Sequence, residues 1–231
     1  AYNNGSMLSV KPTDGDGDFT FVRGSAATRV NAQGLVENVQ IISPELVTNG
    51  NFSQIGSQKV TNGNFSQEGT EQITNGDFAT DSDWTKGTGW SIGGGTANRI
   101  ATGSYTNISQ NGILTAGKTY KVTYTVNSGS IGGVRVQLGG TFAGDYNGVG
   151  THTVYGVSGT TAFNNFMLVG EPTFTGSIDN VSVKEVGQDW TLGTGWSIGD
   201  DKAVCIGNSN HTILTQNESF VSGKTYKVTF D

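Results

Sequence analysis

Two tryptophans, Trp84 and Trp90, are the first candidates for a functional site. An exposed indole ring is a good platform for the apolar face of a sugar and a frequent anchor in binding sites. Both recur 106 positions later, as Trp190 and Trp196. A large aromatic residue that returns in one register also suits a hydrophobic core. Each ring is therefore either a ligand platform or a core residue, and the repetition favours the core.

Tyr146 is a further candidate for a ligand platform, weaker than either tryptophan. Tyr105, Phe142 and Tyr155 are weaker candidates of the same kind.

Asp77 and Asp179 are the candidate metal ligands. Asp179 stands near the end of a predicted strand, where its carboxylate and nearby backbone carbonyls could ligate calcium, a hard cation that prefers oxygen. Asp77 or Asn75 could join it from the opening strand of the same module. The alternative is that each is a turn residue that accepts a hydrogen bond from its own backbone.

No group of residues points to catalysis. His152 and His211 have no Cys or His at metal-ligand spacing. Glycoside hydrolysis needs two carboxylates held a defined distance apart, and no pair stands out in the sequence. We therefore predict that the chain is not an enzyme.

The composition is that of an all-β protein. Gly is abundant at 36 residues, Pro is scarce at 3, and only 14% of residues are charged. Thr and Val favour strands, whereas Gly and Asn favour turns that need a positive φ.

Charge and hydropathy exclude two classes of partner. The net charge of −6 opposes binding to nucleic acid, which requires a basic face. No apolar run approaches the roughly 20 residues of a membrane helix, so no membrane insertion is expected. Residues 1–10 lack the pattern of a signal peptide. Because the first residue is Ala rather than Met, we expect that the true start has been lost.

A short motif, Val/Ile-Thr-Asn-Gly-Asn/Asp-Phe, occurs at residues 47–52, 60–65 and 73–78. We call these opening motifs one, two and three. They could form a short solenoid in which each Val and Phe covers the next. Alternatively they are duplicated domain openings, of which only motif three joins a complete module. Three short units are at the lower limit for a stable array, which favours the second interpretation.

A longer repeat defines the domains. Residues 83–93 return at 189–199, and residues 117–123 return at 223–229, both with an offset of 106. We divide the chain into residues 1–45, an N-terminal β-hairpin anchor; 46–71, motifs and linker; 72–186, module one; and 187–231, the start of module two. Module two stops before its midpoint and has no opening motif of its own in sequence. Either the chain is a fragment of a longer protein or a partner completes the module, and we favour the fragment.

Seven strands are predicted within module one at the spacing typical of a β-sandwich. They cover residues 97–100, 105–108, 118–126, 134–138, 151–157, 163–169 and 176–183. In the N-terminal segment, residues 19–23 alternate like a strand, and Gln33-Gly34 predicts the turn of a hairpin before residues 35–39.

Residues 73–78, Trp84 and residues 178–183 (Ile-Asp-Asn-Val-Ser-Val) together resemble the galactose-binding-like jelly roll of carbohydrate-binding modules found beside xylanases and cellulases. The resemblance covers about half the chain. It implies tandem jelly-roll modules, the second incomplete, and a structural calcium near the first and last strands, at Asp179 and Asp77. The sugar-binding aromatics of that family do not map cleanly onto this sequence.

Residues 16–21, 23–25, 27–31 and 34–37 are similar to a segment of predicted bacteriophage virion proteins, where it precedes lectin-like or jelly-roll modules. The usual Leu-rich or Pro-Arg continuation is absent, and the opening motifs take its place. The resemblance implies a virion appendage: a tail fibre, a head fibre or a capsid decoration.

Three functions follow as hypotheses. The favoured one is a structural or adhesion component of a phage particle, located in the virion. Residues 1–45 would bind other virion proteins, the chain would form a homo-oligomer such as a trimer, and the modules would contact host glycans. The second is an extracellular carbohydrate-binding module of a secreted bacterial polysaccharide-degrading enzyme or adhesin. The third is an inert spacer.

Overall fold

The computed structural model describes residues 28–38, 48–49, 51–129, 131–159, 163–207 and 211–231. These residues form strands, turns and extended segments but no helix, so the fold class is all-β as the composition predicted. No described helix is therefore long and apolar enough to cross a membrane. The chain divides into two compact units, residues 1–57 and 58–231, which are described separately.

The described part of the first unit contains a hairpin. β1 (Thr28–Val30) pairs antiparallel with β2 (Val36–Asn38). The turn between them forms at the predicted position, because Gly34 adopts a φ of 77° and its amide donates to the Asn31 carbonyl at 3.0 Å. This confirms the hairpin of residues 28–38. The other predicted strand, residues 19–23, lies outside the described residues.

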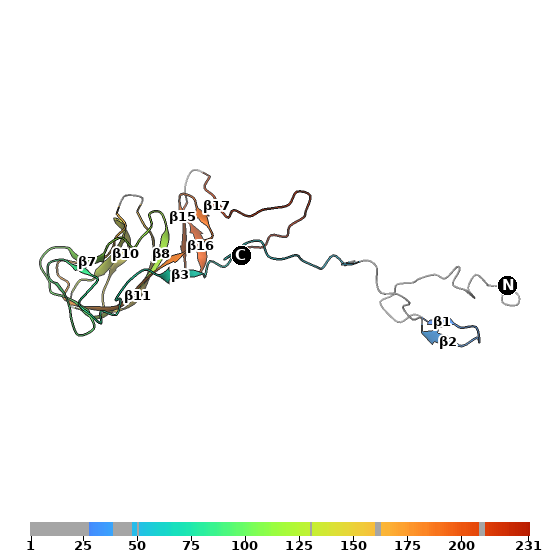
Figure 1. The fold of residues 1–231 in the computed structure, drawn as a ribbon, viewed down its shortest axis with the longest axis horizontal. Helices are drawn as coiled ribbons and strands as arrows, with labels where there is room; N and C mark the ends of the chain where they lie inside the picture. Colours follow the sequence, from blue (N-terminus) through green and yellow to red (C-terminus); the bar gives the residue numbers. More distant parts are fainter. Residues whose placement is uncertain (1–27, 39–47, 50, 130, 160–162, 208–210) are drawn as a thin grey trace. The chain divides into compact units, whose positions relative to one another are not determined.

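Module one consists of two antiparallel sheets that share one hydrophobic core, a β-sandwich-like arrangement (Figure 1). The first sheet has the strand order β10 (Thr141–Asn147), β9 (Val134–Leu138), β12 (Phe166–Gly170), β7 (Thr106–Gln110) and β4 (Thr85–Lys86). The second has the order β11 (Gly150–Val157), β8 (Thr119–Gly129), β13 (Gly176–Val186), β6 (Ala97–Arg99) and β5 (Trp90–Ile92), and β3 (Glu68–Glu71) also pairs with β13.

β8 shows how the sequence builds this core. Tyr120, Val122, Tyr124 and Val126 alternate with polar residues, and all four side chains are at most 1% exposed. Side chains of a strand alternate between its two faces, so this strand presents one apolar face to the opposite sheet. The polar face points outward and carries Lys121.

All seven strands predicted in module one are present, with ends that differ by at most three residues. The short strands β4 and β5 were missed, and so was β10. β10 contains Gly144 and Asp145, which are poor strand formers, and its pairing with β9 is interrupted between Ala143 and Asn147. The interruption explains why no alternation is visible in its sequence.

Module two repeats the first pairings of module one. β14 (Thr191–Leu192) pairs with β17 (Leu214–Thr215), as β4 pairs with β7. β15 (Trp196–Gly199) pairs with β16 (Lys202–Cys205), as β5 pairs with β6. The registers agree after the offset of 106: Thr191 faces Thr215, whereas Thr85 faces Ser109.

Candidate functional site

Opening motif three packs on module one through a tryptophan and a glutamine. The Trp84 indole Nε1 donates to the Asn75 carbonyl at 3.0 Å, and its ring centroid lies 5.1 Å from that of Phe78. The Gln110 side chain accepts from the Thr74 amide at 3.2 Å and donates to the Thr74 carbonyl. We call such a Trp and Gln, with the motif they hold, a docking site.

The motif reaches this site because its backbone turns sharply. Asn75 and Phe78 both have positive φ values, 53° and 50°. Asn adopts this region readily, whereas Phe rarely does. The strained Phe is held because its ring is buried, at 1% exposed. Gly76 then lies so close to β13 that its carbonyl accepts from the Val181 amide at 2.9 Å.

Opening motif two forms the same site on module two. Trp190 Nε1 donates to the Asn62 carbonyl at 3.0 Å, and the Phe65 and Trp190 ring centroids lie 5.1 Å apart. The interplanar angle is 37°, equal to that of Phe78 and Trp84. Gln216 accepts from the Thr61 amide at 3.1 Å.

This arrangement corrects one interpretation of the sequence. Only motif three was expected to join a module, yet motif two does so as well, although it lies 128 positions before Trp190. No opening motif directly precedes module two in the sequence. Motif two, which precedes module one, fills that place in the folded chain. The shared offset of Gln110 and Gln216 was the available signal for this site, because a glutamine that returns at the same position of a repeat and is buried needs hydrogen-bond partners.

The two candidate tryptophan platforms of module one lie in its core. Trp84 and Trp90 are each 7% exposed, and Trp84 also contacts Phe166. Arg99, itself 1% exposed, stands over the Trp90 ring with its guanidinium carbon 5.9 Å from the ring centre. Both rings are therefore core residues, and neither presents an open face to a sugar.

Asp77 and Asp179 both lie where motif three meets β13, and each accepts a local backbone bond. Asp77 Oδ1 accepts from the Ala79 amide at 3.3 Å, and Asp179 Oδ1 accepts from the Asn180 amide at 2.7 Å. In motif two the equivalent of Asp77 is Asn64, which makes the same bond to Ser66 at 3.4 Å. A neutral Asn can fill the role, which favours the turn interpretation of Asp77.

Tyr146 belongs to a group of exposed and half-exposed side chains on the outer side of the first sheet. Its ring lies 5.9 Å from that of Tyr105, which is 60% exposed. The Arg135 guanidinium carbon stands 5.8 Å from the Tyr146 ring centre and 4.6 Å from that of Phe142. We call these four residues the aromatic cluster.

The chemistry of the cluster is that of stacking and neutral hydrogen bonding. Burial, and then the neighbouring Tyr105, raise the pKa of the Tyr146 hydroxyl, so this group stays protonated at neutral pH. Arg135 points outward from β9, because its neighbours Val134 and Val136 are fully buried on the inner side. Aromatic rings with a cation close to two of them, Phe142 and Tyr146, suit a flat, partly apolar ligand rich in hydroxyl groups. Arg135 was not among the residues that the sequence singled out.

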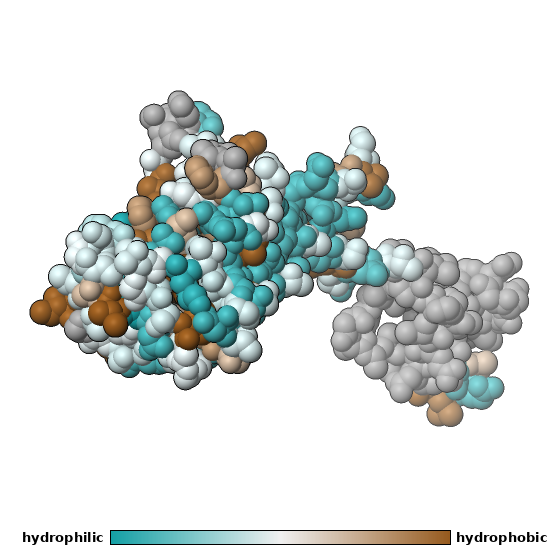
Figure 2. Space-filling model, turned by 60° about the vertical axis from the view of Figure 1, so that its left-hand side comes forward, coloured by the Kyte–Doolittle hydropathy of each residue, from teal (hydrophilic) through white to brown (hydrophobic). Residues whose placement is uncertain are grey.

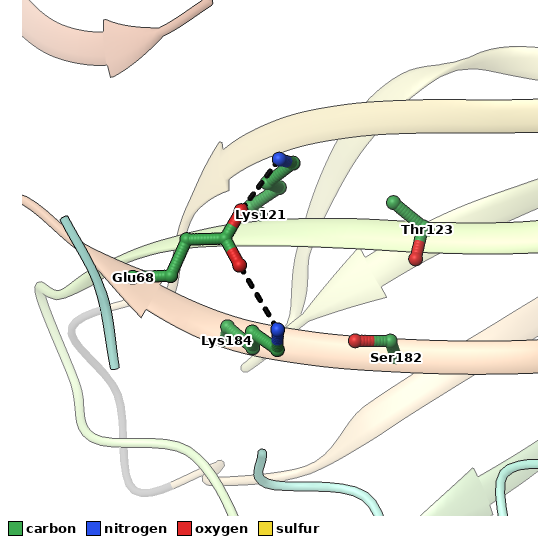
Figure 3. A pocket seen from close by; sticks show the side chains of 5 residues that line it. All are labelled: Glu68, Lys121, Thr123, Ser182 and Lys184. Carbon is green, nitrogen blue, oxygen red and sulfur yellow. Dashed lines mark hydrogen bonds and ion pairs between the residues drawn. The ribbon is translucent and has the colours of Figure 1, made fainter. Parts of the chain in front are cut away.

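A polar hollow of about 220 Å³ lies on the outer side of the second sheet, lined by Glu68, Lys121, Thr123, Ser182 and Lys184 (Figure 3). Glu68 points between the two lysines and accepts from Lys121 at 2.6 Å and from Lys184 at 2.9 Å. These bonds lower the pKa of the Glu68 carboxyl, and the bond that Lys121 donates to Glu68 raises the pKa of Lys121. One carboxylate between two ammonium groups leaves a net positive charge in the hollow. The two ion pairs connect β3 to β8 and β13 and so form a structural ion-pair network.

The described residues contain no group of three or more His, Cys, Asp or Glu side chains that could hold a metal. Exposed apolar residues form separate patches on an otherwise neutral or hydrophilic face (Figure 2). The aromatic cluster is therefore the best candidate for ligand binding, and the docking sites are the best candidates for assembly. Comparison with protein-family models and with curated proteins finds no match to this chain.

Proposed function

We propose that the chain is a structural and adhesion component of a bacteriophage particle, and that its aromatic cluster contacts host glycans. The observation that carries the glycan contact is the pair of Tyr105 and Tyr146 rings, 5.9 Å apart, beside Arg135. Aromatic rings stack on the apolar faces of sugars, and a guanidinium donates to hydroxyl or carboxylate groups. The similarity of residues 16–37 to virion segments supports the particle assignment.

In this proposal the modules are jelly rolls in tandem that project from the particle. The N-terminal segment, residues 1–45, docks on other virion proteins and supports a homo-oligomer such as a trimer. Repetition of the same strand pairings in module two supports a building unit used more than once. No catalytic role is assigned.

Glycan binding is tested on an array with the 231-residue chain and two variants. Tyr105→Ala removes a ring that is 60% exposed, so it should abolish binding while leaving the melting temperature unchanged. The matched control is Phe230→Ala, which removes a ring that is 90% exposed elsewhere in the chain. Binding that survives Tyr105→Ala and Tyr146→Ala together would exclude the aromatic cluster.

The particle assignment is tested by copurification. Antibody against module one should detect the protein in purified particles and decorate an appendage in electron micrographs. The second candidate, an extracellular carbohydrate-binding module of a bacterial enzyme or adhesin, predicts the protein in the culture medium of cells that release no particles. The aromatic cluster would serve either role.

Calcium at Asp77 and Asp179 is retained as a hypothesis with its own test. With two carboxylates that already bond their own backbone, calcium would need backbone carbonyls for its remaining ligands. A titration that raises the melting temperature in the wild type, but not in Asp179→Asn, would support the site. No change in the wild type would reject it.

A further inference from the structure

Opening motif one has no module assigned to it. Its sequence, Val-Thr-Asn-Gly-Asn-Phe-Ser-Gln at residues 47–54, is identical to that of motif two at residues 60–67. Motif two docks on module two, and motif three docks on module one. Two modules account for two motifs, and one motif remains.

The described part of motif one already has the docked conformation. Asn49 and Phe52 have φ values of 55° and 56°, which compare with 44° and 57° for Asn62 and Phe65. The Phe52 amide donates to the Asn49 carbonyl at 2.9 Å, and the Gln54 amide donates to Asn49 Oδ1 at 2.7 Å. The turn is thus encoded in the motif and does not require a module to form it.

The side chain that should dock is left in solvent. Phe52 is 88% exposed, whereas Phe78 is 1% exposed and Phe65 is half-buried. A Phe with a positive φ is strained, and in motifs two and three this conformation directs the ring onto a tryptophan. Motif one therefore presents the docking conformation with an exposed Phe, and it lacks only the Trp and Gln of a module.

The order of the other two pairings indicates which partner it fits. The motif nearest to module one pairs with module one, and the next motif upstream pairs with the next module downstream. The pairing is nested, so the outermost motif should pair with the module after module two. We propose that residues 48–53 are the opening segment of a third module, outside residues 1–231.

The chemistry of that partner follows from the two docking sites that are filled in the structure. It carries a tryptophan whose ring receives Phe52 and whose Nε1 donates to the Asn49 carbonyl. It also carries a glutamine 26 positions later, as Gln110 follows Trp84 and Gln216 follows Trp190, which binds the backbone of Thr48. This inference is independent of glycan binding and of the particle.

The test compares the 231-residue chain with the intact natural chain by amide hydrogen exchange at residues 51–54. In the intact chain these amides should exchange at least about tenfold more slowly, because docking excludes water from the turn. Phe52→Ala should abolish that protection and remove one thermal transition. In the 231-residue chain, Phe52→Ala should leave the melting temperature unchanged.

Three results would overturn the inference: equal exchange in both chains, an intact chain that holds no module beyond the second, or protection in the 231-residue chain that grows with its concentration. The last would assign the docking partner to a second copy of this chain. Phe65→Ala is the positive control, since it vacates a site that the structure shows to be filled.

Discussion

The two docking sites have nearly the same geometry but different burial. Trp84 and Trp190 each lie 5.1 Å from their Phe, at the same tilt, and each donates to an Asn carbonyl at 3.0 Å. Around Trp84 the surrounding core is closed. Around Trp190 the equivalents of core residues are open: Leu114 is 5% exposed, and its counterpart Phe220 is 63% exposed.

The difference follows from the strands that flank each site. In module one, β8 lies between β11 and β13, and Val122 is fully buried. In module two the repeated segment after residue 223 forms no strand, and Val228, the counterpart of Val122, is 77% exposed. No described segment pairs with it as β11 and β13 pair with β8.

The comparison separates two kinds of information. The docking geometry needs only the motif, the tryptophan and the glutamine, because these residues satisfy one another's hydrogen bonds. Burial needs the second sheet, since a sheet can bury its apolar face only against another layer. The same residues should therefore contribute unequally to stability in the two modules.

Tryptophan removal should give the largest contrast. Trp84→Ala should destabilise module one by about 3–5 kcal/mol, because it removes a buried ring and leaves a cavity. Trp190→Ala should cost about 2 kcal/mol or less, because its site is half-open to solvent. Denaturant unfolding followed by fluorescence measures both, and equal losses would contradict the role assigned to burial.

Replacement of the glycine in each opening motif should give the next largest difference in stability between the two docking sites. A Cβ at Gly76 would meet the Val181 carbonyl oxygen at 2.1 Å, so Gly76→Ala should cost about 3 kcal/mol. At Gly63 the nearest atom is Val60 Cγ1 at 3.4 Å, and Gly63→Ala should change stability little. Thermal melts of the two variants check this pair. A large loss at Gly63 would show that a strand like β13 also covers motif two.

Removal of the docking glutamine should give a smaller difference in stability than the glycine replacements. Gln110 is 4% exposed, and Gln110→Ala would leave the Thr74 amide and carbonyl without partners, at a cost of about 1–2 kcal/mol. Gln216→Ala should cost less, because Gln216 is only half-buried and water can replace its side chain at Thr61. Proteolysis rates at residues 60–75 measure the release of each motif, and faster cleavage near Thr61 than near Thr74 would reverse the expected order.

The ion-pair network should give the smallest effect. Its bonds lower the pKa of Glu68, so its stabilisation is present above the ordinary glutamate pKa and is lost as pH falls through the lowered value. The side chains are about one-third exposed, so solvent screening keeps the gain below about 1 kcal/mol. Glu68→Gln should remove this part of the acid dependence of the melting temperature. If the melting temperature of Glu68→Gln fell with acidic pH as that of the wild type does, the network would contribute nothing to stability.

Much of module one could be predicted because strand alternation and turns are local. The alternation of apolar and polar residues at 119–126 is enough to predict a half-buried strand. Arg99 could not be assigned to the core from sequence, because a buried guanidinium is tolerated only where carbonyls such as those of Phe174 and Ser104 converge on it. Burial accordingly lowers its pKa. The sequence named three members of the aromatic cluster as separate candidates, but it could not show that Tyr105 and Tyr146 meet or that Arg135 joins them, because these residues are brought together only by the order of strands in the sheet.

The repeated unit, its strands and the turn of each opening motif can be predicted from the sequence, because these features depend on neighbours along the chain. Which motif docks on which module depends on contacts between distant residues, so it becomes visible only in the folded chain. Motifs one and two are identical over eight residues, so no local property distinguishes them. The choice is made by chain connectivity: β3 is held on β13 through Glu68 and Glu71, and this places motif two beside Trp190.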